Sequence, residues 1–244
     1  MIELKLGDCL QLMFEIPDNS VDMVFCDMPY GTTACKWDSV LDLDLLWVQY
    51  KRLIKADGVI ALTAAQPFTT NLICSNKEWF KYCWYWHKNQ GTNFFHAKRM
   101  PIRKIEEVLV FSTSNKAYKP QITSGHIPTQ SAKGTSTGNI YHGNNIRNEQ
   151  GGKTTRYPDN VLQFKCVSNY KRMHPSEKPI ELIEYLIKTY TNAGDVVLDN
   201  CMGSGTTGVA CKKLNRKFIG IELDDTYFET AKKRIENTEK TNWF

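Results

Sequence analysis

The sequence has no apolar run that approaches the roughly 18 residues of a membrane-spanning helix, and Met1 to Lys5 hold no signal-peptide pattern. Its eight cysteines include no Cys-x-x-Cys pair, and its five histidines lack the spacing of metal ligands. These absences argue against a membrane protein, a secreted disulfide-stabilised domain and a metal centre. We expect a chain with reduced thiols that works in the cytoplasm.

The charge of the chain is modest in sum but unevenly distributed. The 244 residues carry a net charge of +5, and this length suits one domain, or one domain with a sizeable insertion. Between Ser112 and Lys178, ten lysines and arginines stand against three acids, so this segment carries +7 and the rest of the chain −2. A basic segment on a near-neutral body is typical of a protein with a polyanionic partner, and a solvated basic loop is the alternative.

A short buried strand is predicted from Val21 to Cys26, because the stretch is mostly apolar, β-branched or aromatic and is flanked by turn-forming residues. Pro29 cannot extend the hydrogen-bond ladder. Asp27 and Tyr30 are therefore expected at the carboxyl end of the strand, where open α/β sheets bind their ligands. A carboxylate, a backbone carbonyl and a flat ring together suit a planar amine. An ordinary strand-to-turn exit has the same Asp-x-Pro pattern, so this stretch alone leaves both interpretations open.

A glycine-rich loop forms the second candidate site. Gly203-x-Gly205-x-x-Gly208 follows a predicted strand and precedes a predicted helix, and Glu222 lies 19 residues beyond Gly203, near the ~20 typical of a ribose-binding acid. The pattern is half of a mononucleotide-binding unit and fits either NAD or S-adenosylmethionine. Asp199, at the tip of the strand before the loop, disfavours a pyrophosphate and favours a cationic ligand.

The middle of the chain divides into two parts. Residues 79–86 and 106–111 are predicted strands with no convincing crossover helix between them, so they should pair antiparallel. Residues 113–173 are rich in small polar residues and show no sustained period of 2 or 3.6. Because a structureless loop of this length is unusual inside a compact domain, we predict a functional insertion with a small local fold.

Three motifs, taken together, resemble those of the amino-group DNA methyltransferases, which methylate adenine N6 or cytosine N4. Asp27-Met28-Pro29-Tyr30 is similar to the family's Asp-Pro-Pro-Tyr, and Met28 supplies the same backbone carbonyl as the proline it replaces. Residues 199–207 are similar to Asp-Pro-Phe-x-Gly-Ser-Gly-Thr-Thr, with departures at the second and third positions, and residues 174–179 are similar to His-Pro-Thr-x-Lys-Pro. The catalytic motif precedes the cofactor motif, which is the circularly permuted order of the family's β group.

The resemblance implies a fold and a division of the chain. We expect a Rossmann-like S-adenosylmethionine-dependent methyltransferase fold of the α/β class, circularly permuted and with an inserted target-recognition region. Its sheet should be mostly parallel and seven-stranded, with an antiparallel strand. Residues 1–112 should form the catalytic half, residues 113–173 the target-recognition insertion, and residues 174–244 the cofactor-binding half.

The resemblance also implies a function. The chain is expected to be a site-specific methyltransferase that moves a methyl group from S-adenosylmethionine to the N6 amine of an adenine flipped out of double-stranded DNA. In this family an acid typically opens the catalytic motif of adenine N6 enzymes, and serine opens it in most cytosine N4 enzymes. Asp27 therefore favours adenine, with cytosine N4 as the alternative. The resemblance leaves open two further partners, a second copy in a homodimer and a cognate restriction endonuclease, in the cytoplasm of a prokaryotic or phage-infected cell.

Individual roles follow from the matched motifs and from the basic residues. Catalytic roles fall on Asp27, Met28, Pro29 and Tyr30. Cofactor contacts fall on Asp8, Cys9, Lys178, Asp199, Asn200, Cys201, Gly203, Ser204, Gly205, Thr206, Glu222 and Leu223. DNA contacts are expected from Lys98, Arg99, Arg147, Lys153 and Arg156. No metal is expected, and because the mechanism needs no covalent nucleophile the cysteines have no expected catalytic role.

Two other classes of protein compete with this interpretation. The first is a DNA-binding relative that has lost catalysis, with Met28 as the trace of that loss, and the full set of acids and glycines argues against it. The second is a methyltransferase of protein glutamine or RNA, which uses a similar Asx-Pro-Pro-Tyr motif. In that group the cofactor motif normally comes first, so the motif order in this chain favours DNA.

Overall fold

The computed structural model describes residues 1–31, 40–114, 116–136, 145–149, 151–168, 170 and 172–239, and only the backbone of residues 132–136 and 145–149. The chain divides into two compact units. The main unit comprises Met1–Lys119 and Asn160–Phe244, and the second unit comprises Pro120–Asp159. The second unit falls inside the predicted insertion of residues 113–173.

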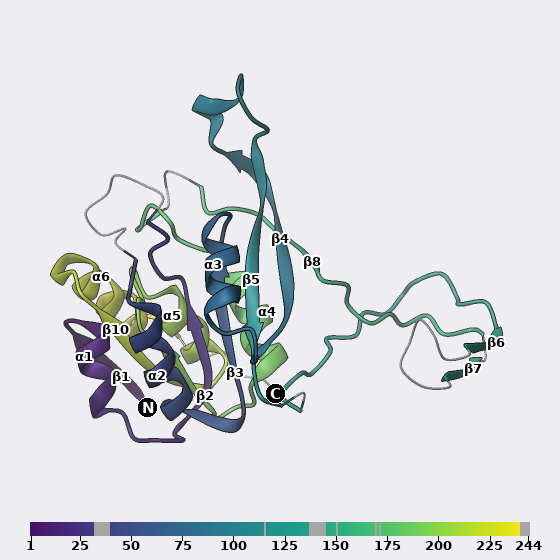
Figure 1. Ribbon diagram of the computed structural model, residues 1–244, viewed down its shortest axis with the longest axis horizontal. Helices are drawn as coiled ribbons and strands as arrows, with labels where there is room; N and C mark the ends of the chain where they lie inside the picture. Colours follow the sequence, from purple (N-terminus) through teal and green to yellow (C-terminus); the bar gives the residue numbers. More distant parts are fainter. Residues whose placement is uncertain are drawn as a thin grey trace. The chain divides into compact units, whose positions relative to one another are not determined.

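An eight-stranded sheet in the order β1-β10-β9-β2-β3-β5-β4-β8 organises the main unit (Figure 1). Its strands are β1 (Ile2–Leu6), β2 (Val21–Cys26), β3 (Ile54–Ala64), β4 (Phe80–Thr92), β5 (Arg103–Phe111), β8 (Val161–Phe164), β9 (Val196–Asp199) and β10 (Lys217–Glu222). Neighbouring strands are parallel except where β5 pairs with β3 and with β4. The prediction of a mostly parallel sheet with an antiparallel strand is confirmed.

The predicted number of seven strands is wrong, because the described residues form eight in this sheet. The additional strand, β8, pairs with the edge strand β4 and lies in the stretch where no period was detected. Four residues are too short to display a period of 2, and Leu162 is the one buried side chain among them. In the second unit, β6 (Ala132–Ser136) and β7 (Asn145–Glu149) form an antiparallel pair.

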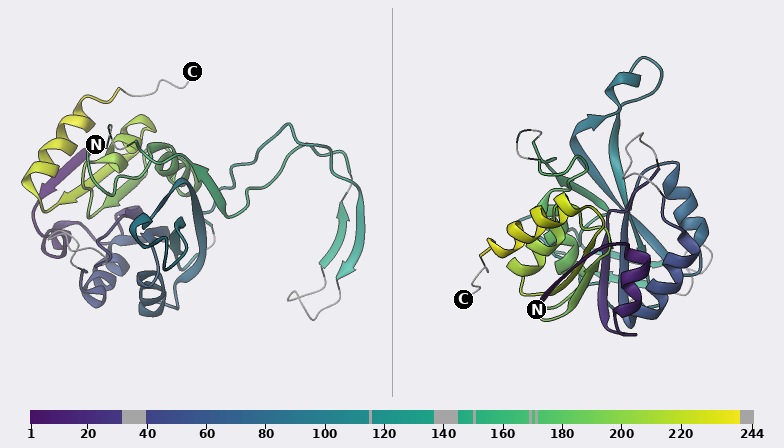
Figure 2. Two further views of the ribbon diagram at one scale, coloured as in Figure 1. Left: turned by 90° about the horizontal axis from the view of Figure 1, so that it is seen from above. Right: turned by 90° about the vertical axis from the view of Figure 1, so that its left-hand side faces the viewer.

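Helices cover both faces of the sheet (Figure 2). They are α1 (Cys9–Leu12), α2 (Leu43–Leu53), α3 (Phe68–Ser75), α4 (Ile180–Tyr190), α5 (Thr206–Lys213) and α6 (Asp225–Glu236), with the 3-10 helices η1 (Met13–Glu15) and η2 (Phe94–His96). Alternate residues of β2 enter different cores. Met23 and Phe25 pack in the core with α4, α5 and α6, whereas Val24 and Cys26 pack in the core with α1, α2 and α3. This burial on both faces explains why β2 is an apolar run rather than an alternating one.

The strands β4 and β5 form a hairpin that extends past the carboxyl end of β3. Ala64, the last residue of β3, pairs with Glu107, but the pairing of β4 with β5 continues as far as Thr92 and Arg103. The hairpin therefore rises above the edge of the sheet at which β2 and β3 end (Figure 1). The residues from His87 to Thr92 continue β4 rather than beginning a loop.

None of the helices in the described residues has the length and apolar content needed to cross a membrane.

Candidate active site

One pocket of about 600 Å³ joins the carboxyl ends of β2, β9 and β10. All four residues predicted to be catalytic line it, as do all the predicted cofactor residues except Gly205. The two predicted sites, which are about 170 residues apart in the chain, therefore share one cavity. The order of the strands explains this, because β9 pairs with both β2 and β10 and brings their carboxyl ends to the same edge.

The Asp27 carboxylate is held on both of its oxygens. Thr63 at the end of β3 donates a short hydrogen bond to Oδ1, and the Tyr30 hydroxyl lies 2.9 Å from the same atom. The Lys178 ammonium donates to Oδ2 at 2.7 Å. Residues from β3 and from the loop before α4 thus fix the orientation of the side chain that ends β2.

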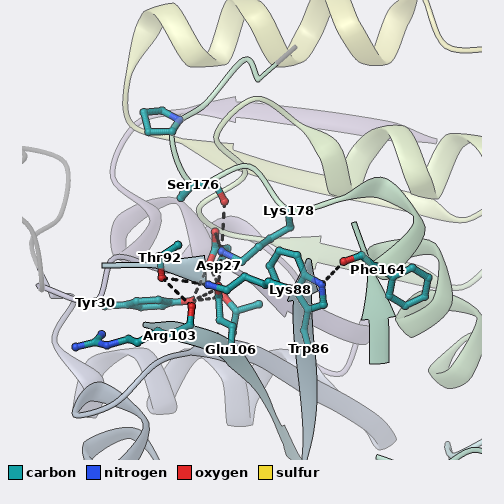
Figure 3. A network of polar contacts seen from close by, with 12 residues as sticks. Asp27, Tyr30, Trp86, Lys88, Thr92, Arg103, Glu106, Phe164, Ser176 and Lys178 are labelled. Atoms are coloured by element: carbon teal, nitrogen blue, oxygen red, sulfur yellow. Dashed lines mark hydrogen bonds and ion pairs between the residues drawn. The ribbon is translucent and has the colours of Figure 1, made fainter. Parts of the chain in front are cut away.

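The ammonium of Lys178 has all three of its N–H groups engaged. Besides Asp27 Oδ2 it contacts Glu106 Oε1 at 2.8 Å and the backbone carbonyl of Ser176 at 3.3 Å. Glu106 also forms an ion pair with Lys88, at 3.3 Å from Oε2 (Figure 3). Lys178, which was predicted to bind the cofactor, lines the pocket, but its three donors contact other protein groups. These contacts favour a role in positioning Asp27 over direct binding of a cofactor.

The charge states in this network follow from burial and from the neighbouring groups. Burial alone would lower the pKa of Lys178, but the charges of Asp27 and Glu106 raise it above its usual range. Burial alone would raise the pKa of Glu106, but Lys178 and Lys88 lower it. Burial, reinforced by Asp27 and Glu106, raises the pKa of Tyr30 well above its ordinary value. At neutral pH Glu106 is therefore ionised, Lys178 is charged and the phenol of Tyr30 is neutral.

The aromatic ring of Tyr30 is supported by Phe68 at the start of α3. The two rings stack with their centroids 5.3 Å apart and their planes inclined by 22°. Tyr30 also lines the pocket. A ring that is braced by a neighbour and tied through its hydroxyl presents a fixed flat surface on which a heterocycle can stack.

Glu222, at the end of β10, holds the glycine loop through hydrogen bonds to backbone N–H groups. Its Oε2 accepts a hydrogen bond from the Gly203 N–H at 2.8 Å, and its Oε1 accepts from Leu223 at 3.0 Å and Asp224 at 2.9 Å. Gly203 has a φ of +50°, which favours glycine. Glu222 thus fixes the shape of the loop as well as lining the pocket.

Gly205 has a packing role rather than a place in the pocket. Its φ is +78°, and a Cβ at this position would lie 2.8 Å from the Cβ of Ala231 on α6. The glycine lets α6 pack closely against the start of α5. From their spacing alone, Gly203 and Gly205 are both expected to contact the ligand. The structure shows that Gly203 lines the pocket, whereas Gly205 packs against α6.

Asp199 is fully buried beneath the loop. It accepts hydrogen bonds from the Thr207 hydroxyl at 2.6 Å and from the Cys201 N–H at 3.2 Å. Burial raises the pKa of Asp199 to about 7, although these hydrogen bonds oppose the rise. A cation bound beside this carboxyl would favour its ionised form.

Two of the predicted cofactor residues that line the pocket, Asn200 and Asp8, also form hydrogen bonds within the protein. The Asn200 amide accepts a hydrogen bond from Tyr50 at 2.6 Å, and its nitrogen lies 3.6 Å from the sulfurs of both Cys9 and Cys201. Asp8 caps α1 by accepting from the Leu10 N–H at 2.8 Å, and it also lines the pocket. The described residues contain no group of three or more His, Cys, Asp and Glu that could hold a metal ion.

The pocket lining is strongly acidic. Six carboxylates line it together with one lysine and one histidine; the acids are Asp8, Asp27, Glu177, Asp199, Glu222 and Asp224. Glu177 is paired with Arg234 at 2.7 Å. The remaining excess of negative charge opposes a phosphate-bearing ligand and favours a cationic one.

The predicted DNA-binding residues lie in two places. Lys98 and Arg99 are exposed in the loop that joins β4 to β5, beside the exposed rings of Phe94 and Phe95. Lys153 is exposed in the second unit, and the side chain of Arg147 lies outside the described residues. The guanidinium of Arg156 donates to the backbone carbonyls of Lys153, Thr155 and Ile127, so it stabilises the second unit itself.

Three residues of the network around Asp27 were not predicted from the sequence, namely Thr63, Lys88 and Glu106. A signal for Lys88 was present, because Trp84, Trp86 and Lys88 follow a period of 2 and all three are buried. Extending the predicted strand by two residues would have directed this lysine into the core. A buried lysine requires a buried acid, and the adjacent strand offers Glu106.

Comparison with known proteins identifies the class of this fold and site. The main unit has the fold of the S-adenosylmethionine-dependent methyltransferases: a crystal structure of M1.HpyAVI in complex with S-adenosylmethionine matches 96% of this chain and 99% of its own, with a TM-score of 0.64 and 25% sequence identity. The predicted methyltransferase fold is confirmed.

The family model described as DNA methylase matches residues 21–233, and the chain belongs to this family. It is 25% identical to the type II methyltransferase M.HpaI of Haemophilus parainfluenzae, over 96% of this chain and 74% of that protein. It is 28% identical to the DNA adenine methyltransferase YhdJ of Escherichia coli K12, over 94% of this chain and 81% of that protein. The predicted membership of the amino-group DNA methyltransferases is confirmed.

Proposed function

We propose that the protein transfers the methyl group of S-adenosylmethionine to the N6 amine of adenine in double-stranded DNA. The observation that carries the proposal is that Asp27-Met28-Pro29-Tyr30 and the Gly203 loop line the same acidic pocket. The excess of carboxylates suits a ligand with a sulfonium and an ammonium group. The relatives named as type II and DNA adenine methyltransferases support the choice of DNA and of adenine.

In the proposed mechanism the protein positions two reactants rather than forming a covalent intermediate. The target base leaves the DNA stack and enters the pocket, where its ring stacks on Tyr30. Asp27 and the carbonyl of Met28 accept the two N–H groups of the amine. They favour a pyramidal nitrogen and stabilise the positive charge that develops during attack on the methyl group.

The proposed cofactor contacts follow the lining of the pocket. Glu222 accepts the ribose hydroxyls, Asp8 binds the adenine amine, and Asp199 lies beside the positively charged end of the cofactor. Cytosine N4 is the second candidate target, because both bases present the same amino group to Asp27.

A purified-protein assay that follows labelled methyl groups into DNA tests the activity and separates it from DNA binding without catalysis.

We propose the remaining assignments from the sequence in the same way. Residues 113–173 form the target-recognition insertion between the catalytic half (1–112) and the cofactor-binding half (174–244), in the circularly permuted order. A second copy of the chain and a cognate restriction endonuclease are candidate partners, and the DNA is methylated in the cytoplasm. Sedimentation of the purified protein tests for a dimer. Inspection of the genes that flank its own tests for a cognate restriction endonuclease.

Binding of S-adenosylmethionine should depend on pH through Asp199. Its raised pKa of about 7 means that the apo protein holds a proton there near neutrality, and the stability that this protonated form contributes is lost as pH rises towards 7. A cationic cofactor requires the ionised form. The affinity should therefore fall as pH is lowered from 8 to 6, by a factor that approaches ~10 per pH unit below the pKa.

Calorimetric titration in two buffers of different ionisation enthalpy measures the proton released on binding. Asp199→Asn should bind more weakly and lose most of this pH dependence, which separates Asp199 from the nearby His174. Binding without proton release between pH 6 and 7 would show that the cation lies elsewhere.

DNA binding should weaken steeply with salt, because lysines and arginines displace counterions from phosphates. Replacing Arg147 and Lys153 with alanine, as representatives of the basic segment, should reduce the salt slope by ~0.9 for each phosphate that the variant no longer neutralises. Arg156 belongs to the same predicted set, but its three carbonyl contacts make it a poor variant for this purpose. Cofactor binding should be unchanged.

The matched comparison is the pair Lys98 and Arg99 on the β4–β5 hairpin, and the control is Lys232 with Lys233 on the exposed face of α6. Filter binding at several salt concentrations gives the slopes. An unchanged slope in the second-unit variant, with a reduced slope in the hairpin variant, would move the main DNA surface to the hairpin. There the exposed Phe94 and Phe95 are suited to stacking on bases.

A further inference from the structure

Glu106 on β5 lies outside the predicted motifs but at the centre of the polar network beside Asp27 (Figure 3). Its side chain is only 12% exposed, and it accepts from Lys178 at 2.8 Å and from Lys88 at 3.3 Å. The Tyr30 hydroxyl lies 3.3 Å from its Oε1. The next residue, Glu107, points to the other face of the strand and accepts from the Thr69 hydroxyl at 2.6 Å. Two consecutive acids thus differ in position, and only Glu106 contacts the network around Asp27.

The acceptor sites of Asp27 are unevenly occupied. Oδ1 accepts from Thr63 and lies 2.9 Å from the Tyr30 hydroxyl. Within the described part of the chain, the hydrogen-bond partner of Oδ2 is Lys178 alone. Because a carboxylate has about four lone-pair sites, Oδ2 retains one position at which a further N–H can donate.

Lys178 orients Oδ2 but also offsets its negative charge. Methyl transfer moves positive charge from the sulfonium to the amine, so Asp27 must remain a negative partner for that amine. Lys178 lies 2.7 Å from Asp27 and 2.8 Å from Glu106, so the two carboxylates share one ammonium almost equally. Lys88 lies farther from Glu106, at 3.3 Å from Oε2, so it offsets only part of the charge on that carboxylate.

We propose that Glu106 is a positioning residue for methyl transfer. By sharing Lys178 it lets that ammonium fix the Asp27 carboxylate without neutralising it, and the open site on Oδ2 then receives the target amine. Glu106 does not line the pocket, so it acts through the residues that it contacts there. These are Lys178, which fixes Asp27, and Tyr30, whose hydroxyl lies 3.3 Å from Glu106 Oε1. The inference rests on the proposed function.

The test compares Glu106→Gln with the matched control Glu107→Gln on the same strand. Glu106→Gln should lower kcat by at least ~10-fold, as expected for the loss of part of an electrostatic contact in the transition state. Its KM for DNA and its Kd for S-adenosylmethionine should stay within about twofold of wild type, because neither ligand touches Glu106. Glu107→Gln should retain the wild-type kcat. A wild-type kcat in Glu106→Gln would overturn the proposal.

A second variant separates the proposed role from a purely structural one. Glu106→Gln leaves Lys88 buried without a counter-charge, which should lower Tm. The double variant Glu106→Gln/Lys88→Met removes that charge, so Tm should return towards the wild-type value while kcat stays low, because Lys178 is still not shared. Recovery of kcat together with Tm would show that Glu106 only stabilises the fold and would overturn the proposal.

Failure of the proposed function gives a different result. In that case the wild-type protein itself transfers no methyl groups to DNA. If the wild type is active, the comparison of the variants tests Glu106 alone.

Discussion

Replacing Asp27 with alanine is expected to slow methyl transfer by ~10²-fold to 10³-fold or more, which is the usual effect of removing one group that stabilises transition-state charge. The carboxylate is held by Thr63 and Lys178 in one orientation, and the alanine variant has no acceptor for the amine on that side. Cofactor affinity should change by no more than a few-fold, because the proposed cofactor contacts of Asp8, Asp199 and Glu222 lie at the carboxyl ends of β1, β9 and β10. Single-turnover kinetics and calorimetric titration with S-adenosylmethionine measure the two quantities.

The control for this prediction is Asp27→Asn, which keeps the size of the side chain but offers one acceptor oxygen and no charge. It should fold with a Tm closer to that of wild type and still be slow. An Asp27→Ala variant that lost cofactor binding as much as turnover would contradict the assigned role.

The reverse pattern is expected for Glu222→Ala, which should weaken cofactor binding first. The variant loses the proposed contacts to the ribose and also three hydrogen bonds from Gly203, Leu223 and Asp224. A hydrogen bond to a charged group contributes about 1.5–3 kcal/mol, so loss of even one such bond to the cofactor corresponds to a roughly tenfold or greater rise in Kd. Turnover at saturating cofactor should fall less than in Asp27→Ala.

Two further variants give this second prediction its controls. Glu229→Ala removes an exposed acid from α6 and should bind the cofactor as wild type does. Glu222→Gln keeps a hydrogen-bond acceptor for the loop and should fall between wild type and Glu222→Ala. An unchanged cofactor affinity in Glu222→Ala would show that the ribose is bound elsewhere.

The carboxyl ends of the strands were predictable from local sequence. The apolar run of β2 ends at Pro29, and the short apolar run of β9 ends at Asp199 before a glycine loop. Both patterns depend on neighbours in the chain, so a single sequence is enough to find them. The sharing of one pocket by these two ends follows from the order of the strands, in which β9 pairs with both β2 and β10.

Contacts between residues distant in the chain were not predictable in the same way. Glu106 is 72 residues before Lys178, and nothing in either local sequence pairs them. The edge strand β8 carries one buried side chain, so its four residues resemble a loop. The boundary of β4 was placed too early because a lysine interrupts the apolar pattern, although Lys88 is buried and forms an ion pair with Glu106.

The measurement that tests the central claim most directly is mass spectrometry of nucleosides from DNA methylated by this protein in a host that lacks its own methylation. The proposed function predicts N6-methyladenine as the main modified base, present with the wild-type protein and absent with Asp27→Ala. N4-methylcytosine as the main product would contradict the adenine assignment. Unmodified DNA from cells that contain the folded protein would contradict the proposed methyltransferase activity as a whole.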